Sequence, residues 1–168
     1  LQKQNYQEIS TPQFFDNRLW KISGHWEHYK ENIFLSQYEN RSFGAKPMNC
    51  PASMLVYKTK TRSYKNLPLR LAEFGVVHRQ ELSGVLAGLF RVVKFTQDDA
   101  HIFCTKEQLE EEISKALELM KTVYTTFGFE YTVELSTRPE KFMGEKKDWD
   151  YSEKILESVL KKSKIKFK

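Results

Sequence analysis

Residues 95–104, FTQDDAHIFC, carry polar side chains in an unusual order. Side chains of an extended strand alternate between two faces. One face of this segment would carry the following residues: Phe95, Gln97, Asp99, His101 and Phe103. This row could stack a purine on Phe95, hold an ammonium group at Asp99 and ligate a metal ion with His101. Because a buried carboxylate and imidazole are costly unless satisfied, the alternative is a face covered by another element, with its polar groups paired internally.

A cysteine elsewhere in the chain could join His101 in a metal site. Cys50 lies where Asn49 and Pro51 predict the start of a helix, and a helix N-terminus lowers the pKa of a thiol. A thiolate and a neutral imidazole are good zinc ligands, and a catalytic zinc has three protein ligands and one open position. By their spacing alone, a buried cysteine and a hydrogen-bonded core histidine explain the two residues better.

Two arginines lie at the ends of the segment that joins two predicted strands. If the strands pair, Arg79 and Arg91 face the same end of the sheet. Two guanidinium groups suit a polyphosphate, because each can bind phosphate oxygens in a bidentate manner. Glu81 could accept hydrogen bonds from the edge of a base. A solvated Arg–Glu pair on a loop is the alternative.

Those two strands must position the candidate residues. Residues 67–79, LPLRLAEFGVVHR, predict one strand, and residues 90–104, FRVVKFTQDDAHIFC, predict a longer one. The polar, glycine-containing residues 80–89 connect them. Together these segments predict an antiparallel hairpin with a wide loop.

Further elements are predicted on both sides of the hairpin. Thr105 and Gln108 form a capping box for a helix over residues 106–127, which has one apolar stripe and ends at Gly128. Before the hairpin, we expect a helix that carries Phe15, Leu19 and Ile22 and ends at Gly24, a short helix or turn over 24–34, and a helix that starts near Pro51. After the helix over 106–127, we expect a strand over 129–136, a loop over 136–144 and an amphipathic helix over 149–162. Ile165 and Phe167 predict the opening of a further strand. This order predicts an α+β fold, with an antiparallel sheet flanked by helices in one continuous domain.

Composition and charge exclude several protein classes. The chain has 168 residues, 40% of them hydrophobic, which suffices for one domain with a real core. The sequence contains no run of about 20 apolar residues that would predict a membrane span, and its start lacks the apolar centre of a secretory signal. Two cysteines are too few for a disulfide scaffold, so we expect an intracellular protein. The net charge of +5 permits contact with nucleic acid or phosphates without requiring it.

Six segments, taken together, resemble the catalytic domain of threonyl-tRNA synthetases. In chain order they are LWKISGHWEHYKENIF, KPMNCP, LPLRLAEFGVVHRQE, SGVLAGLFRV, FTQDDAHIFCT and STRPEKFMG. The segments FTQDDAHIFCT and STRPEK are specific to that enzyme among the class II synthetases. Residues 11–13, TPQ, resemble the end of class II motif 1, and the residues from RLAEFG to TQDDAHIF resemble motif 2. The chain departs from the family at Ala52 and Ser53, where Gly-His is usual.

The resemblance implies a role for each candidate residue. The row of side chains on residues 95–103 would form the floor of an adenylation site. The implied ATP-binding residues are Arg79 at the α-phosphate, Glu81 near the adenine amino group, Arg91, and Phe95 stacked on adenine. Arg79 is also the implied catalytic residue. The implied threonine contacts are Met48, Gln97 and Asp99, and the implied zinc ligands are Cys50 and His101, with a third ligand outside this chain.

The resemblance also implies an activity and partners. It implies a threonine–tRNA ligase that uses ATP and Mg²⁺ to activate threonine and then transfers it to tRNA(Thr), with Zn²⁺ in the amino-acid site. Residues 1–168 would form part of a class II catalytic domain, with the end of motif 1, the zinc-ligand segment and motif 2. Motif 3 and the anticodon-binding domain would follow Lys168.

We expect a cytoplasmic homodimer that associates through the motif 1 region, without membrane contact, and an organellar location stays open. Two alternatives to the ligase also stay open. One is a synthetase-like paralogue that senses an amino acid or binds RNA without aminoacylation. The other is one half of a split enzyme.

Overall fold

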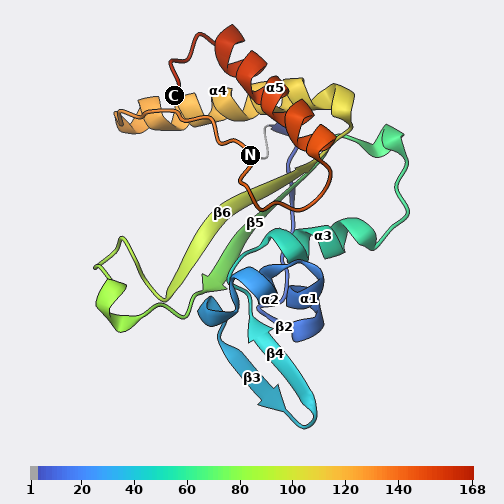
Figure 1. Ribbon diagram of the computed structural model, residues 1–168, viewed down its shortest axis with the longest axis vertical. Helices are drawn as coiled ribbons and strands as arrows, with labels where there is room; N and C mark the ends of the chain where they lie inside the picture. The colour runs from blue at the N-terminus through green and yellow to red at the C-terminus, as the bar shows by residue number, and fades with distance from the viewer. Residues whose placement is uncertain (1–3) are drawn as a thin grey trace. The chain divides into compact units, whose positions relative to one another are not determined.

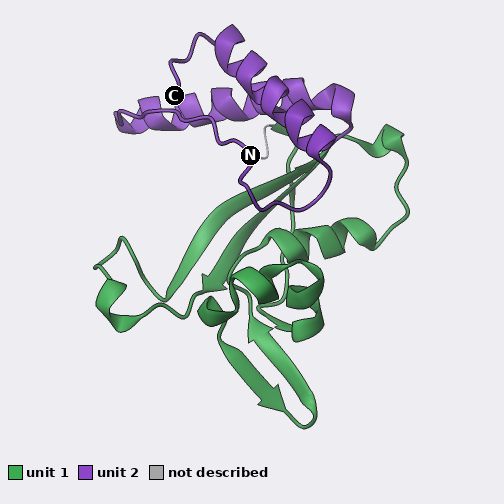
Figure 2. Cartoon of the chain, viewed as in Figure 1, with its two compact units in different colours: residues 1–103 green, residues 104–168 purple. Residues whose placement is uncertain are grey.

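The computed structural model describes residues 4–168, and the chain divides into two compact units, Leu1–Phe103 and Cys104–Lys168 (Figure 2). The first unit contains the strands β1–β6, and the second contains the two long helices α4 and α5 (Figure 1). Antiparallel strand pairs with helices confirm the predicted α+β class. The assignment of the whole chain to one continuous domain stays a prediction.

The first sheet has the order β1-β5-β6, formed by Gln7–Glu8, Leu69–His78 and Lys94–Phe103. β5 and β6 pair antiparallel without interruption, from Leu69 opposite Phe103 to His78 opposite Lys94, which confirms the predicted hairpin. β1 joins β5 in parallel. β6 begins at Lys94 rather than at residue 90, because the preceding residues belong to the loop, where Ala87 and Arg91 pair with each other.

A second sheet, which the sequence did not predict, has the order β2-β4-β3. It is antiparallel throughout and consists of Phe14–Asp16, Arg41–Ala45 and Leu35–Tyr38. Gly44 lies in its central strand, where a Cβ atom would come within 2.7 Å of Trp20 Nε1. Since Trp20 is fully buried, the glycine lets this indole pack directly against the sheet.

Short helices lie between the strands of the first unit. They are α1 (Asn17–Ile22), α2 (His25–His28), α3 (Cys50–Lys58) and the 3₁₀ turns η2 (Lys30–Asn32), η3 (Tyr64–Asn66) and η4 (Ser83–Val85). α1 starts later than predicted, because Phe15 belongs to β2 and the Asp16 carboxylate accepts a hydrogen bond from the backbone N–H of Arg18 at 3.0 Å. Gly24, with a φ of 78°, follows the helix as expected.

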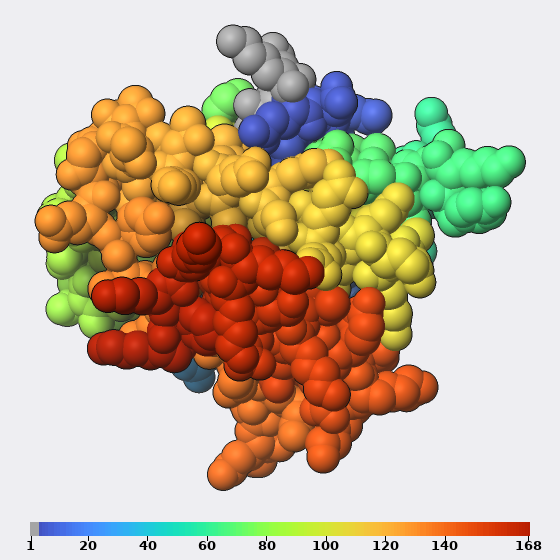
Figure 3. All heavy atoms as spheres, turned by 90° about the horizontal axis from the view of Figure 1, so that it is seen from above, coloured from blue at the N-terminus to red at the C-terminus, as the bar shows by residue number. Residues whose placement is uncertain are grey.

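The second unit is built on α4 (Leu109–Phe127) and α5 (Lys146–Lys162), which pack against each other. Thr105 and Gln108 form the predicted capping box at the 3₁₀ turn η5 (Lys106–Gln108), which precedes α4, and Gly128 ends α4 with a φ of 68°. In Figure 3 the C-terminal residues, in red, lie along the yellow and orange α4.

The predicted strand over residues 129–136 is wrong. Its backbone forms a single bridge, between Val133 and Phe167, with Lys168 N donating to Val133 O and Leu135 N donating to Lys168 O. A strand needs a partner along its length, and within residues 4–168 the segment meets one only at this point. The strand opening predicted at Ile165 and Phe167 is likewise limited to that bridge.

A buried ion pair joins the segment after β4 to the first sheet. Lys46 Nζ lies 3.0 Å from Glu73 Oε1 on β5, and the Lys46 and Glu73 side chains are almost fully buried. Thr11 completes the cluster, because its hydroxyl accepts a hydrogen bond from Lys46 and donates to Glu73, and its backbone N–H also donates to Glu73. A buried charge is tolerated when it is paired and hydrogen-bonded in this way.

We predict that Lys46→Ala lowers the free energy of unfolding by about 3–5 kcal/mol, because it leaves the Glu73 carboxylate buried without its cation. Urea unfolding followed by circular dichroism measures this change. Arg41→Ala, which removes the exposed ion pair with Asp16, is the matched control and should have a much smaller effect. Equal effects of the two substitutions would contradict the proposed importance of the buried pair.

Candidate active site

The row of side chains on β6 has the predicted alternation. Phe95, Gln97, Asp99 and His101 are partly buried, whereas Thr96, Asp98 and Ala100 between them are exposed. Residues directly opposite in an antiparallel pair share a face, so Gly75 of β5 lies beside Gln97 on the same side of the sheet.

Helix α3 lies against this face. The residue before its first turn, Asn49, contacts β6, because its Nδ2 donates to Asp99 Oδ2 at 3.1 Å. Its last turn contacts β6 through Tyr57, whose ring stacks on Phe103 with centroids 4.3 Å apart. The helix therefore covers the half of the row that includes Asp99 and His101.

A cavity of about 310 Å³ opens at the other half of the row. It is lined by Tyr29, Arg79, Glu81, Phe90, Arg91, Val92 and Phe95. All four residues predicted to bind a nucleotide are in this list. The pairing of β5 with β6 brings them together, because Arg79 and Glu81 leave the end of one strand and Arg91 and Phe95 enter the other.

The two arginines of this cavity are held differently. Arg79 Nε donates to Pro47 O at 3.2 Å, and its guanidinium lies 5.0 Å from the centre of the Phe95 ring. Arg91 donates from Nη2 to Glu81 Oε2 at 2.9 Å, so the Arg–Glu pair weighed as an alternative is present. Arg79 is thus fixed beside an aromatic ring, and Arg91 is neutralised by a carboxylate inside the same cavity.

The electrostatics of Cys50 differ from the prediction. Burial raises the pKa of its thiol, and the negative charge of Asp99 raises it further, while a hydrogen bond from the backbone N–H of Cys50 lowers it less. The expectation of a lowered pKa was wrong because desolvation outweighs the helix N-terminus here. Cys50 lies near the row on β6, because the residue before it, Asn49, bonds to Asp99.

The metal prediction for Cys50 and His101 stays a prediction. The two residues come from facing elements, the start of α3 and the strand β6. Within residues 4–168, no group of three or more His, Cys, Asp or Glu side chains is arranged to hold a metal ion.

Met48 lies beside a histidine that the sequence analysis did not assign to the site. His25 Nε2 is 3.3 Å from Met48 Sδ, and its Nδ1 is 2.9 Å from Ser23 Oγ. Burial lowers the pKa of His25, and a hydrogen bond to the backbone of Ser23 opposes that shift.

Three other residues were missed in the same way. Tyr29, Phe90 and Val92 line the cavity with the predicted arginines. Tyr29 comes from the segment between α2 and η2, so only the tertiary fold brings it to the hairpin. Asn49 predicts a helix start, but the sequence does not show its tertiary contact, in which the side chain bonds to Asp99.

Comparison with known proteins identifies the family of the chain. Residues 31–168 match the model of the tRNA synthetase class II core domain (G, H, P, S and T). The chain belongs to the class II tRNA synthetase core family. The resemblance stated from the sequence is thereby confirmed, and the hairpin with its cavity lies in a synthetase catalytic domain.

Curated relatives of this class II core are threonine–tRNA ligases. The chain is 54% identical over 166 residues to the enzyme of Caldanaerobacter subterraneus, covering 99% of this chain and 26% of the relative. It is 52% identical to the cytoplasmic enzyme of Saccharomyces cerevisiae over 95% of this chain and 22% of the relative. The chain thus spans about a quarter of the length of these relatives.

Solved structures agree with the class II assignment. The RNA binding domain of threonyl-tRNA synthetase from Cryptosporidium parvum Iowa II has a TM-score of 0.93 and 45% identity, and the match covers 99% of this chain and 42% of that one. A putative threonyl-tRNA synthetase from Aeropyrum pernix has a TM-score of 0.89 and 34% identity, over 99% of this chain and 40% of that one. No helix in the described part of the class II core is long and apolar enough to cross a membrane.

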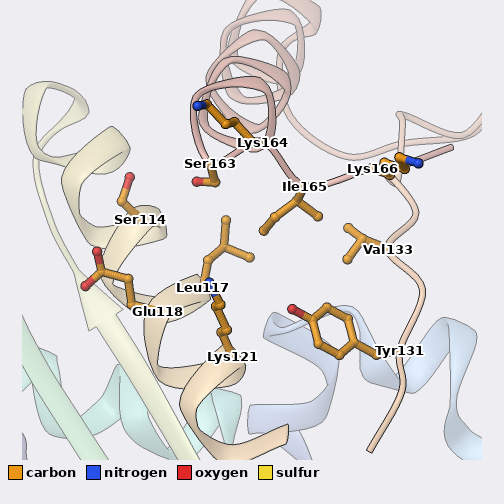
Figure 4. A pocket seen from close by; sticks show the side chains of 10 residues that line it. All are labelled: Ser114, Leu117, Glu118, Lys121, Tyr131, Val133, Ser163, Lys164, Ile165 and Lys166. Atoms are coloured by element: carbon orange, nitrogen blue, oxygen red, sulfur yellow. The ribbon is translucent and has the colours of Figure 1, made fainter. Parts of the chain in front are cut away.

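A second cavity, of about 540 Å³, lies within the second unit of the class II core (Figure 4). Leu117 of α4 and the side chains of Val133 and Ile165 turn toward the same hollow, and the Tyr131 ring lies beside them. Lysines stand at its edge: Lys121, Lys164 and Lys166. None of the predicted site residues lines this cavity.

Proposed function

We propose that the chain is part of the catalytic core of a threonine–tRNA ligase, which activates threonine with ATP and transfers it to tRNA(Thr). The observation that carries this proposal is the continuity of the row on β6. One strand connects the cavity that contains two arginines and Phe95 with the Asp99 carboxylate near Cys50. Relatives named threonine–tRNA ligase at 52–54% identity support this choice within class II.

The cavity at the end of the hairpin is the proposed ATP site. Phe95 stacks on adenine, and Glu81 accepts a hydrogen bond from its amino group. Arg79 contacts the α-phosphate, and Arg91 contacts the nucleotide after exchanging its bond with Glu81 for phosphate oxygens. Mg²⁺ accompanies the polyphosphate, as it does in most nucleotide sites.

The covered half of the row is the proposed threonine site. Asp99 and Gln97 bind the ammonium group of threonine, and Met48 lines the pocket. The donor types of Cys50 and His101 fit a zinc ion, since sulfur and imidazole nitrogen are its preferred ligands. When bound, zinc would supply a Lewis-acidic contact for the amino and hydroxyl groups of threonine. A site that binds the hydroxyl rejects valine far better than an apolar pocket of the same shape does.

The reaction needs positioning and charge neutralisation more than a general base. The threonine carboxylate attacks the α-phosphorus in line, a new P–O bond forms, and pyrophosphate leaves with the electrons of the broken bond. Arg79 neutralises charge that develops on the α-phosphate oxygens, and its bond to Pro47 O holds the guanidinium in place before substrate arrives. Arg79 is therefore the proposed catalytic residue.

The proposed protein is a cytoplasmic homodimer that associates through the motif 1 region, which ends at residues 11–13. The second sheet begins directly after this segment, at Phe14, and its exposed apolar side chains support the proposal: Phe14, Leu35 and Tyr38. Relatives from yeast and human carry the word cytoplasmic in their names, which supports the same location here.

The proposed activity is tested by threonine-dependent exchange of pyrophosphate into ATP, measured on the full-length gene product. We predict that Cys50→Ala abolishes this exchange and removes bound zinc, measured by mass spectrometry of the purified protein. Cys104→Ala, the control, should keep both. Exchange and zinc content that survive in Cys50→Ala would exclude a zinc role for this residue, and a wild-type protein without exchange would favour the paralogue that does not aminoacylate.

A second prediction concerns the adenine end of the row. Phe95→Ala should raise the KM for ATP about tenfold or more, because stacking of a base on an aromatic ring contributes about 1–3 kcal/mol. The KM for threonine should change little. Phe74→Ala is the matched control, since Phe74 lies on the opposite face of the same hairpin and is 67% exposed. An ATP KM that responds equally to both substitutions would argue against adenine stacking at Phe95.

A further inference from the structure

Asn49 is an asparagine at a helix start that does not cap its helix. Asparagine at this position usually accepts a hydrogen bond from a backbone N–H of the first turn. Asn49 makes no such side-chain bond to α3. Its amide is turned to β6 instead, where Nδ2 donates to Asp99 Oδ2 at 3.1 Å. The helix therefore gives up a local cap for a contact with the carboxylate of the row.

The amide is also completely enclosed. Asn49 is 1% exposed, and its Oδ1 atom has no hydrogen-bond partner among residues 4–168. An ionised carboxylate can only accept hydrogen bonds, so the NH₂ group must face Asp99 and Oδ1 must point away. A buried polar atom without a partner is unusual in folded proteins. Such a residue is better explained by its effect on Asp99 than by packing, for which an apolar side chain would serve.

The sheet leaves room for this amide at one position. A Cβ atom on Gly75 would lie 2.2 Å from Asn49 Oδ1 and 2.4 Å from Nδ2. Gly75 is opposite Gln97 and therefore shares the face of the row. The Asn49 amide thus occupies the space that a side chain at position 75 would fill. The backbone of Gly75 is not left-handed, so its conformation does not require glycine. Glycine is required here because the Asn49 amide comes too close for any side chain.

We propose that Asn49 is a positioning residue that holds the Asp99 carboxylate in the orientation that receives the substrate ammonium group, and that Gly75 provides its seat. This inference rests on the proposed function, and it adds two residues that the motif comparison did not assign. The hydrogen bond immobilises one carboxylate oxygen, Oδ2, and leaves Oδ1 of Asp99 to face the ligand. Without Asn49, the carboxylate can rotate and the ammonium group loses a fixed partner.

The test uses the full-length gene product and separates the KM for threonine from the KM for ATP. Asn49→Ala should raise the KM for threonine about tenfold, as expected for loss of a hydrogen bond to a charged group. The KM for ATP should stay unchanged, because the nucleotide cavity does not include Asn49. Asn17→Ala is the matched control. Asn17 is also buried, donates to Ser42 Oγ at 2.5 Å and has an unpartnered Oδ1, but it lies in α1 beside the second sheet.

Gly75→Ala provides an independent route to the same defect, because its methyl group must displace the Asn49 amide. The double variant, Gly75→Ala with Asn49→Ala, is decisive, since the new methyl group fills the space left by the deleted amide and preserves packing. It should fold at least as well as either single variant and should keep the raised KM for threonine. The single effects on KM should therefore not add in the double variant.

Two results would overturn the inference. One is a normal KM for threonine in the double variant, and the other is a rise in both KM values by the same factor in Asn49→Ala. Either result would make Asn49 a structural residue like Asn17. A wild-type protein that shows no threonine-dependent exchange would instead reject the proposed function, so the two failures are distinguishable.

Discussion

The continuous antiparallel pairing of β5 with β6 is the constraint on which the site depends. Because side chains alternate strictly along each strand, the pairing places Phe95, Gln97, Asp99 and His101 on one face beside Gly75 of the partner strand. A shift of the register by one residue would move all of them to the opposite face. The same pairing brings the two ends of the connecting loop together, and with them the two arginines of the cavity.

Buried polar contacts then fix the segment that crosses this face. Lys46 is bonded to Glu73 and Thr11, its backbone N–H donates to Gln13 O, and its carbonyl accepts from the backbone N–H of His78. Pro47 O accepts from Arg79 Nε, and Asn49 donates to Asp99. Charged and amide groups hold residues 46–50 at several points along two strands. Directional bonds of this kind define one position more sharply than apolar packing alone.

The elements that could be predicted from the sequence are those whose signals are local. The alternation along 95–103 and the capping box at Thr105 both gave correct elements, because strand and helix periods are visible in the residues themselves. The β3–β4 hairpin is also local, since Tyr38 pairs with Arg41 across a two-residue turn, but the sequence analysis did not recognise that turn. The pairing of β2 with β4 and the single bridge of Val133 with Phe167 depend on partners far away in the chain. The site residues, like the elements, could be predicted where their signals are local. Arg79, Glu81, Arg91 and Phe95 lie on one hairpin and were found together, whereas Tyr29 and the contact of Asn49 with Asp99 come from separate segments.

The spacing along β6 sets the length of the ligand that the row can hold. Side chains on one face of a strand recur about every 6.7 Å, which separates Phe95 from Asp99 by about 13 Å along the strand and from His101 by about 20 Å. An aminoacyl-adenylate is elongated, with a purine at one end and an ammonium group at the other, and it needs contacts at both ends at a fixed separation. A paired strand keeps that separation rigid, whereas a loop would not. In the proposed site, different residues of one strand bind the two ends, so amino-acid preference can change at the end near Asp99 while the groups around the nucleotide stay in place.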